Sequence, residues 1–265
     1  MTSAVVLARG LGTRMQAVDG AVRLTPAQQR AADVGHKPMM PIHGRPFLDY
    51  VLSALADAGI PRVALVVAPD HDALRLRYTR ESPPSRLALS FVVQPEPRGT
   101  ANAVLAAESW TGGDPFLAMN ADNLYPAAVL ADLVSLGESG LPAFDADDLV
   151  RSSNIPPQRI AAFAVLEVDT AGYLTAIVEK PDRPPDDPLL VSMNCWRFDS
   201  RIFSACRDVP RSPRGEFELP GAVDLAIARG IRFRAVPAHG PVLDLSQRGD
   251  AAEIERRLAG TAPRP

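Results

Sequence analysis

The chain has 265 residues, of which 46% are hydrophobic, and its net charge at pH 7 is −3. The weakly acidic balance disfavours a nucleic-acid partner, and no apolar run approaches the roughly 20 residues that span a membrane. The amino terminus lacks the pattern of a signal peptide, so we expect a cytoplasmic protein in which Cys195 and Cys206 are free thiols.

The first strand and the turn after it organise the chain. Residues 4–8 form a short apolar run that predicts a buried parallel strand, and Gly10 and Gly12 follow it. The glycines permit a tight turn and a close approach to a ligand, whose phosphate oxygens backbone amides can bind. Arg14 adds a permanent positive charge. This layout indicates a polyphosphate site, and a plain strand-to-helix turn is the alternative.

A polar stretch over residues 16–35 follows the turn. Thr25 and Pro26 inside it predict the start of a helix, with threonine as the N-cap. The stretch is either a lid over the site or a loop without a chemical role.

The next elements alternate between helix and strand. Residues 47–58 predict an amphipathic helix, 62–68 a buried strand, 70–78 a helix and 87–93 a third strand. Alternation of this kind predicts a parallel sheet with helices on both faces.

The only lysines are Lys37 and Lys180, while the other 26 of the 28 basic residues are arginine. Each lysine precedes a proline. Because this chain uses arginine on its surface, both lysines are expected where a compact ammonium group is needed; chance survival at exposed sites is the alternative.

The third strand ends at Gln94, which lies shortly before Gly99 and Thr100 and an alanine-rich helix expected over 101–109. An amide at the carboxyl end of a strand offers a donor and an acceptor to a nucleobase edge. The alternative is a glutamine that only caps its own loop.

A fourth strand over residues 115–123 contains Asp122 at its carboxyl end. A carboxylate in this position is a common Mg²⁺ ligand. The alternative is an N-cap for the helix expected over 126–136.

The second half begins with residues 139–157, which are expected to be irregular and to separate two halves of the chain. Strands over 160–169 and 173–179 form a hairpin that brings Glu179 and Lys180 together. The remaining expected elements are strands over 189–198, 231–236 and 242–245, the last containing Asp244, and helices over 200–206, 222–229 and 250–258.

Taken in order, these segments resemble the sugar-1-phosphate nucleotidyltransferases. The likeness is carried by residues 10–15, 37–42, Gln94 with 99–101, 122–123, 178–181 and 214–219. It implies an α/β fold, with a Rossmann-like, mostly parallel mixed sheet flanked by helices and a small β-rich substrate-binding portion. It also implies one domain over 1–265, with a nucleotide-binding half over about 1–138 and a sugar-phosphate-binding half over about 139–265.

Three features depart from the family pattern. Arg9 replaces a small residue, and the interval from Arg14 to Lys37 is longer than usual, so residues 16–35 hold an insertion. Asp244 is followed by Leu245 and Ser246, not by Gly-Thr. No hexapeptide-repeat pattern follows, so acetyltransferase activity is not expected.

The resemblance implies that an NTP and a sugar 1-phosphate react to give an NDP-sugar and pyrophosphate, with Mg²⁺ as the cofactor. The implied catalytic residues are Arg14, Lys37, Asp122 and Lys180, and the implied metal ligands are Asp122 and Asp244. The implied nucleotide-binding residues are Ala8, Gly10, Leu11, Gly12, Thr13, Gln94, Gly99 and Thr100. The implied acceptor-binding residues are Asn123, Glu179, Lys180 and Asn194.

Two other functions stay open. One is a cytidylyltransferase or molybdopterin-type nucleotidyltransferase acting on another phosphate acceptor, although these enzymes do not usually carry the Glu-Lys-Pro hairpin. The other is a regulatory subunit that senses a nucleotide or a sugar phosphate without catalysis. The base, the sugar and the oligomeric state, a homo-oligomer included, are not determined by the sequence.

Overall fold

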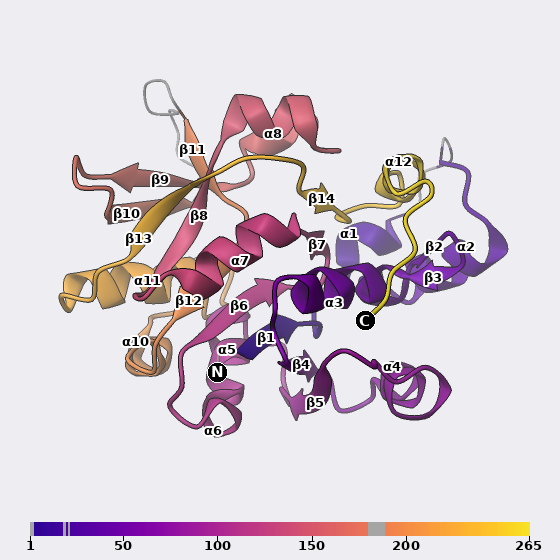
Figure 1. Cartoon of the computed structure of the whole chain (residues 1–265), viewed down its shortest axis with the longest axis horizontal. Coiled ribbons are helices and arrows are strands. Elements are labelled where there is room, and N and C mark those ends of the chain that lie inside the picture. Colours follow the sequence, from indigo (N-terminus) through magenta and orange to yellow (C-terminus); the bar gives the residue numbers. More distant parts are fainter. Residues whose placement is uncertain (1–2, 18–19, 21, 180–188) are drawn as a thin grey trace.

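The computed structural model describes residues 3–17, 20, 22–179 and 189–265. Within these residues a mixed sheet of ten strands forms the centre of the molecule (Figure 1). Across the sheet the strands are β10 (Leu174–Glu179), β9 (Ala164–Val168), β11 (Leu190–Ser192), β8 (Gly140–Asp145), β12 (Cys195–Phe198), β6 (Phe116–Asn120), β1 (Ser3–Leu7), β4 (Arg62–Val67) and β5 (Ala88–Val93), and β13 (Arg234–Ala238) pairs with β8.

The four strands from β6 to β5 are parallel to one another. Their core is apolar on both faces, as in β1, where Ala4, Val5 and Val6 are fully buried. Such uncharged, β-branched runs suit a sheet that helices cover on both sides. Because the strands run in one direction, the loops after their carboxyl ends meet at one edge.

The other half of the sheet is mainly antiparallel. Strand β12 reverses direction beside β6, and β11, β9 and β10 continue with antiparallel pairs. The expected α/β fold is confirmed: a mixed sheet flanked by helices, with a β-rich portion contributed by the second half of the chain.

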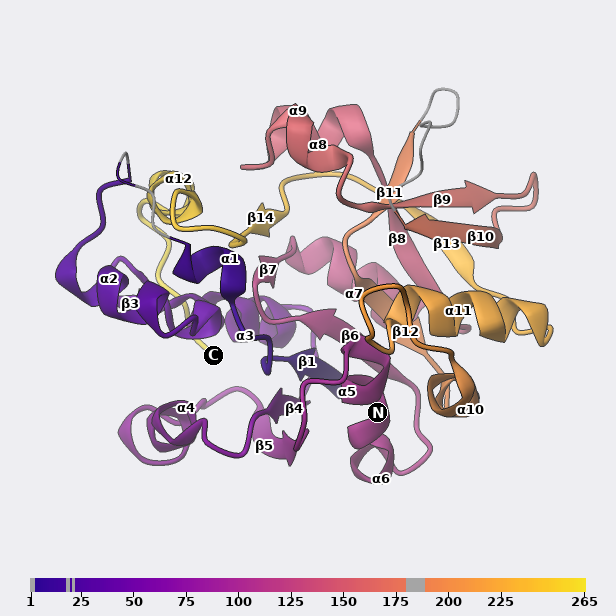
Figure 2. The ribbon, with the colours of Figure 1, turned by 180° about the vertical axis from the view of Figure 1, so that it is seen from behind.

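Helices cover both faces of the sheet. One face carries α3 (Phe47–Asp57) and α7 (Ala127–Ser135), which contact each other, and the opposite face, seen in Figure 2, carries α5 (Thr100–Ala106), α10 (Ile202–Asp208) and α11 (Leu219–Ala228). The other described helices are α1 (Thr13–Gln16), α2 (Pro26–Asp33), α4 (Asp72–Leu76), α6 (Glu108–Thr111), α8 (Ala146–Ser152), α9 (Pro157–Ile160) and α12 (Asp250–Arg257), with a 3₁₀ turn at Lys37–Met39 and a π-helical turn at Arg77–Glu81. Each face of the sheet therefore has its own hydrophobic core.

Two small ribbons lie outside the main sheet. Strands β2 (Pro41–Ile42) and β3 (Arg45–Pro46) form one, and β7 (Asn123–Leu124) and β14 (Leu243–Asp244) form the other. In the second ribbon Asp244 lies opposite Asn123. None of the helices described has the length and apolar character that crossing a membrane requires.

The expectation that residues 139–157 are irregular was wrong. This region contains β8, in the interior of the sheet, and α8, whose N-cap Asp145 accepts a hydrogen bond from the Asp148 amide at 2.8 Å. Gly140 lets β13 approach, because a Cβ there would lie 2.5 Å from the Arg234 carbonyl oxygen. Gly140 is thus explained by close strand packing and Asp145 by a helix cap.

The strand expected over 189–198 is also not continuous. Asn194, with a φ of 60°, separates β11 from β12. Asparagine is one of the few residues that adopt this left-handed conformation readily, and it ends the extended run. The strand expected over 160–169 begins only at Ala164, because Pro157–Ile160 forms α9.

Candidate active site

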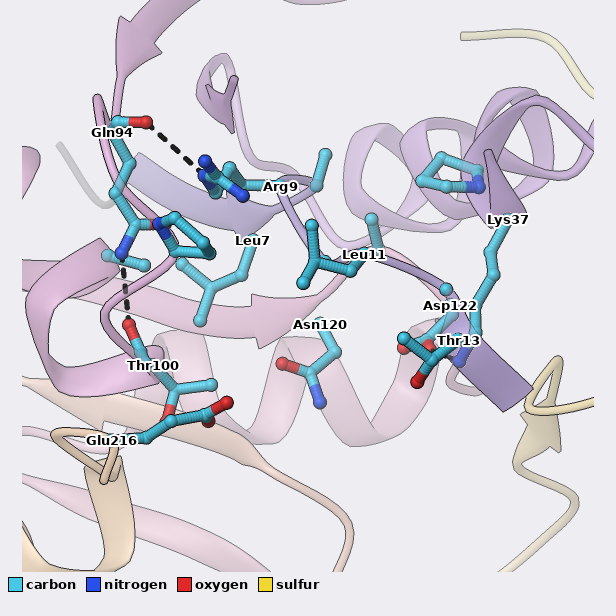
Figure 3. Close-up of a pocket in the computed structure, with 18 residues that line it drawn as sticks. Leu7, Arg9, Leu11, Thr13, Lys37, Gln94, Thr100, Asn120, Asp122 and Glu216 are labelled. Carbon is cyan, nitrogen blue, oxygen red and sulfur yellow. Dashed lines mark hydrogen bonds and ion pairs between the residues drawn. The ribbon is translucent and has the colours of Figure 1, made fainter. Parts of the chain in front are cut away.

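The carboxyl ends of β1, β5 and β6 surround a pocket of about 370 Å³ (Figure 3). The eight residues predicted to bind the nucleotide all line it: Ala8, Gly10, Leu11, Gly12, Thr13, Gln94, Gly99 and Thr100. Lys37 and Asp122 lie at the same pocket. The tertiary structure therefore brings together residues that the sequence spreads over more than 110 positions, and we call this space the nucleotide pocket.

The glycine turn packs closely against the insertion. Gly12 has a φ of 63°, and a Cβ on it would lie 2.2 Å from the Gly35 carbonyl oxygen. Gly10 is different, since nothing lies within 4 Å of its Cβ position. Gly12 thus serves the local packing, whereas Gly10 leaves space beside the pocket.

The insertion forms an ordered helix. Thr25 and Gln28 make a reciprocal capping box at the start of α2. Buried Arg248 donates to the carbonyl oxygen of Met15 at 2.7 Å and to Asp33 at 2.8 Å, which joins the glycine turn, the insertion and the C-terminal segment. Whether the insertion acts as a lid stays a prediction.

Lys37 reaches the carboxylate at the end of the fourth parallel strand. Its Nζ lies 2.8 Å from Asp122 Oδ2. Asp122 does not cap the following helix, because α7 begins after Pro126 and has no side-chain cap. The N-cap alternative for Asp122 was therefore wrong.

Gln94 is almost fully buried, and its side chain holds its own loop. Its Nε2 donates to the Gly99 carbonyl oxygen at 3.1 Å and to Asn102 Oδ1 at 2.9 Å. Both amide hydrogens are therefore used within the protein, and Oε1 is the polar atom left for a ligand. Gln94 therefore both holds its own loop and lines the nucleotide pocket.

Arg9 joins the glycine turn to the loop that contains Gln94. Its Nε donates to the backbone oxygen of Gln94 at 3.3 Å (Figure 3), and its Nη2 donates to that of Pro95 at 3.4 Å. Burial lowers the pKa of Arg9, and the nearby Asp70 carboxylate opposes this change. Arg9, which stands where the family pattern has a small residue, thus connects two walls of the nucleotide pocket through hydrogen bonds.

A second pocket of about 210 Å³ adjoins the first, and we call it the acceptor pocket. Lys37, Asn120 and Asp122 line both pockets. Four predicted site residues, Arg14, Asn123, Asn194 and Asp244, line the acceptor pocket alone. Arg14 therefore lies at the acceptor pocket and not at the nucleotide pocket.

Asp244 is held in a dense hydrogen-bond network. Asn123 Nδ2 donates to its Oδ1 at 3.1 Å, and Ser246 Oγ and Arg159 Nη1 donate to its Oδ2 at 2.8 and 2.9 Å. Burial raises the pKa of Asp244 and the Asp122 carboxylate adds to this rise, while Ser246 and Arg159 oppose it. Ser246 provides a hydroxyl donor in the segment that lacks Gly-Thr.

Asp122 and Asp244 fit a magnesium ion by the chemistry of their donor atoms. The Leu245 amide donates to the Asp122 carbonyl oxygen at 2.9 Å, so the two aspartates belong to adjoining backbone segments. Mg²⁺ is commonly held by one or two carboxylates together with substrate phosphates and water. The described residues contain no group of three or more potential metal-ligating side chains, so these two carboxylates would need oxygen ligands from the substrates.

The prediction on Lys180 and on the Glu179 side chain lies outside the described residues. Sequence reasoning missed several residues that line the pockets, among them the polar residues Asn120, Arg159, Arg214 and Glu216. Arg214 and Glu216 were within a motif segment, and Asn120 is two positions before Asp122, so their neighbourhood was a signal. Arg159 follows the stretch that was misjudged as irregular and had no recognisable pattern.

Comparison with known proteins identifies the family of the chain. Residues 3–241 match the family model described as nucleotidyl transferase. The chain is 29% identical over 255 residues to the UTP–glucose-1-phosphate uridylyltransferase AglF of Haloferax volcanii, covering 96% of each chain. It is also 29% identical to a glucose-1-phosphate thymidylyltransferase of Streptomyces griseus, covering 98% of this chain and 67% of that protein. It spans 64% of the length of Agl11, a low-salt glycan biosynthesis nucleotidyltransferase of Haloferax volcanii.

Solved structures show the same fold. A UDP-glucose pyrophosphorylase in complex with UDP-glucose superposes with a TM-score of 0.77 at 19% identity, covering 99% of this chain and all of the other. A second UDP-glucose pyrophosphorylase, from Acinetobacter baumannii, gives a TM-score of 0.74 at 19% identity, covering 99% of this chain and 95% of the other. The chain therefore belongs to the nucleotidyl transferase family, which confirms its resemblance to the sugar-1-phosphate nucleotidyltransferases.

Proposed function

We propose that this protein transfers a nucleoside monophosphate from an NTP to a sugar 1-phosphate, releasing pyrophosphate, in a reaction that depends on Mg²⁺. One observation carries the proposal: two adjoining pockets share Lys37, Asn120 and Asp122. A reaction between two bound anions needs this arrangement, because the reacting phosphates must meet where both positive charge and metal-binding carboxylates are available. The names of the relatives support the same reaction class.

In this mechanism a phosphate oxygen of the acceptor attacks the α-phosphorus in line, and pyrophosphate leaves. The backbone amides from Gly10 to Thr13 bind the triphosphate, and Lys37 stabilises charge on the α-phosphate. Arg14 lies at the acceptor pocket, where it holds phosphate charge close to the reacting group. Asp122 and Asp244 would hold Mg²⁺, which would neutralise part of the charge of the two anions.

The nucleotide is proposed to be UTP or dTTP. With both amide hydrogens of Gln94 donated to Gly99 and Asn102, the remaining oxygen requires a donor on the base. Uracil and thymine present N3–H and guanine presents N1–H as such a donor, whereas cytosine and adenine carry an acceptor at the corresponding ring nitrogen and offer a donor only on the exocyclic amino group. The uridylyl- and thymidylyltransferase relatives support this choice and make glucose 1-phosphate the first acceptor to test.

The test is pyrophosphate release from UTP, dTTP, CTP, ATP and GTP, each with glucose 1-phosphate and with a set of other sugar 1-phosphates. Release that needs both UTP or dTTP and a sugar phosphate, and that EDTA abolishes, is the expected result. Release with a polyol phosphate, and with none of the sugar phosphates, would favour the cytidylyltransferase-type alternative. Binding of nucleotide and sugar phosphate without release in any combination would favour the regulatory alternative.

A further inference from the structure

Arg159 lies at the end of a short helix, α9, with its side chain mostly buried at the acceptor pocket. Only 11% of the side chain is exposed. Its Nη1 donates to Asp244 Oδ2 at 2.9 Å, and its Nη2 donates to Asp250 Oδ1 at 2.8 Å. The two aspartates come from β14 and from the first position of α12, so the guanidinium plane is held from two sides.

These two hydrogen bonds leave part of the guanidinium available. Arginine has five N–H donors, and Arg159 uses two of them on partners in the described part of the chain. The residue also lines the acceptor pocket. An arginine whose plane is already oriented loses little freedom when its remaining donors bind a ligand.

Contacts other than those of Arg159 also hold the chain segment around Asp244. The side chain of Asn154 pairs with the backbone of Asp244, with Nδ2 donating to its carbonyl oxygen at 2.9 Å and Oδ1 accepting from its amide at 2.8 Å. Ser153 Oγ accepts from the Val242 amide at 3.0 Å. These contacts hold the backbone of β14, whereas Arg159 contacts the side chain of Asp244.

The charges around the acceptor pocket suit an anion. Among the described residues that line it, Arg14, Lys37, Arg159 and Arg214 are cationic, and Asp122 and Asp244 are acidic. A guanidinium fork matches the oxygens of a phosphate group, and charge-assisted hydrogen bonds of this kind are strong. Arg159 is also hydrogen-bonded to Asp244, which lines the same pocket.

We infer that Arg159 binds the phosphate group of the acceptor, with Asp250 as the residue that positions its guanidinium. This inference rests on the proposed function and adds a residue to the recognition of the acceptor. It predicts that a substitution of Arg159 weakens binding of the acceptor and leaves binding of the NTP unchanged. Asp250 acts through Arg159 and also accepts hydrogen bonds from the Ser246 and Gln247 amides at 2.9 and 2.7 Å.

The test uses the full chain with UTP and glucose 1-phosphate, or the pair that the wild type prefers. Arg159→Gln is expected to raise KM for the sugar phosphate at least about tenfold, with KM for UTP within about twofold. Arg159→Lys keeps the charge but loses the fork, so it is expected to fall between the wild type and Arg159→Gln. Arg151→Gln, which removes an exposed arginine of α8 that contacts Asp148, is the matched control and should change neither constant.

Two further measurements distinguish a loss of phosphate binding from a folding defect. Inorganic phosphate, used as a competitor of the sugar phosphate, should inhibit Arg159→Gln more weakly than the wild type. Asp250→Asn should raise KM for the sugar phosphate less than Arg159→Gln does, and this second variant keeps the inference testable if Arg159→Gln does not fold.

The outcomes are distinct. Unchanged acceptor KM and unchanged phosphate inhibition in folded Arg159 variants, with an active wild type, would overturn the inference alone. If the Arg159 variants changed only the Mg²⁺ concentration that activity requires, the role of Arg159 would be to position Asp244. This result would also overturn the inference. Failure of the wild type to release pyrophosphate with any sugar phosphate would reject the proposed function together with the inference.

Discussion

Lys37 Nζ and Asp122 Oδ2 lie 2.8 Å apart, although 85 positions separate the two residues in the chain. The pair stands where the nucleotide pocket and the acceptor pocket adjoin, and both residues line both spaces. Each charge is therefore compensated by the other in the protein without ligands. Phosphates and a metal ion would offer new partners to both groups at the same place.

The first prediction concerns this ion pair. Asp122→Asn and Lys37→Met should each lower kcat about a hundredfold or more, because each removes a charge placed for the transferred phosphate. Thermal unfolding should show that both variants fold. Asp57→Asn is the control, since Asp57 forms an ion pair of 2.7 Å with Arg86 on the exposed surface. Near-normal pyrophosphate release by Asp122→Asn or Lys37→Met would contradict the role given to that residue.

The second prediction concerns the choice of base. Asn102→Ala removes one of the two acceptors that orient the Gln94 amide, so the amide can present either end to the ligand. The preference for UTP over CTP, measured as the ratio of kcat/KM values, should fall about tenfold, which is the size expected for one hydrogen bond. Asn102→Asp retains an acceptor for Nε2 and should keep the preference. Equal ratios in wild type and Asn102→Ala would refute orientation by this contact.

The third prediction separates two glycines of the same turn. Gly12→Ala should lower the melting temperature, because a left-handed φ costs about 1–2 kcal/mol for an L-residue and the Cβ would meet the Gly35 carbonyl oxygen at 2.2 Å. Gly10→Ala meets no atom within 4 Å and should fold normally. If the turn binds phosphates, Gly10→Ala should raise KM for the NTP about tenfold by filling the space for the ligand. An unchanged KM would exclude close approach of the ligand at Gly10.

The fourth prediction concerns Arg9. Arg9→Ala removes two hydrogen bonds to the backbone oxygens of Gln94 and Pro95 and should raise KM for the NTP about fivefold with little change in kcat. Arg98→Ala is the control on the same loop, because Arg98 is exposed and contacts Glu96 at 2.7 Å. Equal effects of the two variants would show that only the general charge of the loop matters.

The fifth prediction concerns the thiols. Burial raises the pKa of Cys206 to about 12 and raises that of Cys195 still further above its ordinary value. A thiol whose pKa is raised stays protonated and unreactive at pH 8, since only the thiolate is nucleophilic. A disulfide reagent such as DTNB should therefore react with neither cysteine in the native protein and with both in denaturant. Rapid reaction of one thiol in the native state would show that its part of the core opens.

Several parts of the fold and site were predictable from the sequence because they depend on local pattern. The apolar run before Gly10 predicts a parallel strand, and parallel strands place their carboxyl ends at one edge. This rule alone places the glycine turn, Gln94 and Asp122 near one another, and the structure shows them around one pocket. The two free cysteines were also predicted and are confirmed.

Other parts were decided by contacts between distant segments. The prolines, aspartates and serines of residues 139–157 favour an irregular segment, yet Gly140–Asp145 forms β8, with β13 packed closely beside Gly140. Arg159 follows a stretch without a readable pattern, and only the fold places its guanidinium between Asp244 and Asp250.

The sequence by itself determined which chemical groups stand at strand ends, since strand periodicity and turn residues act over a few positions. The tertiary structure alone decided which charges meet, as with Lys37 and Asp122. The physical reason is that hydrogen bonds and ion pairs act over a few ångströms in space, whatever the distance along the chain.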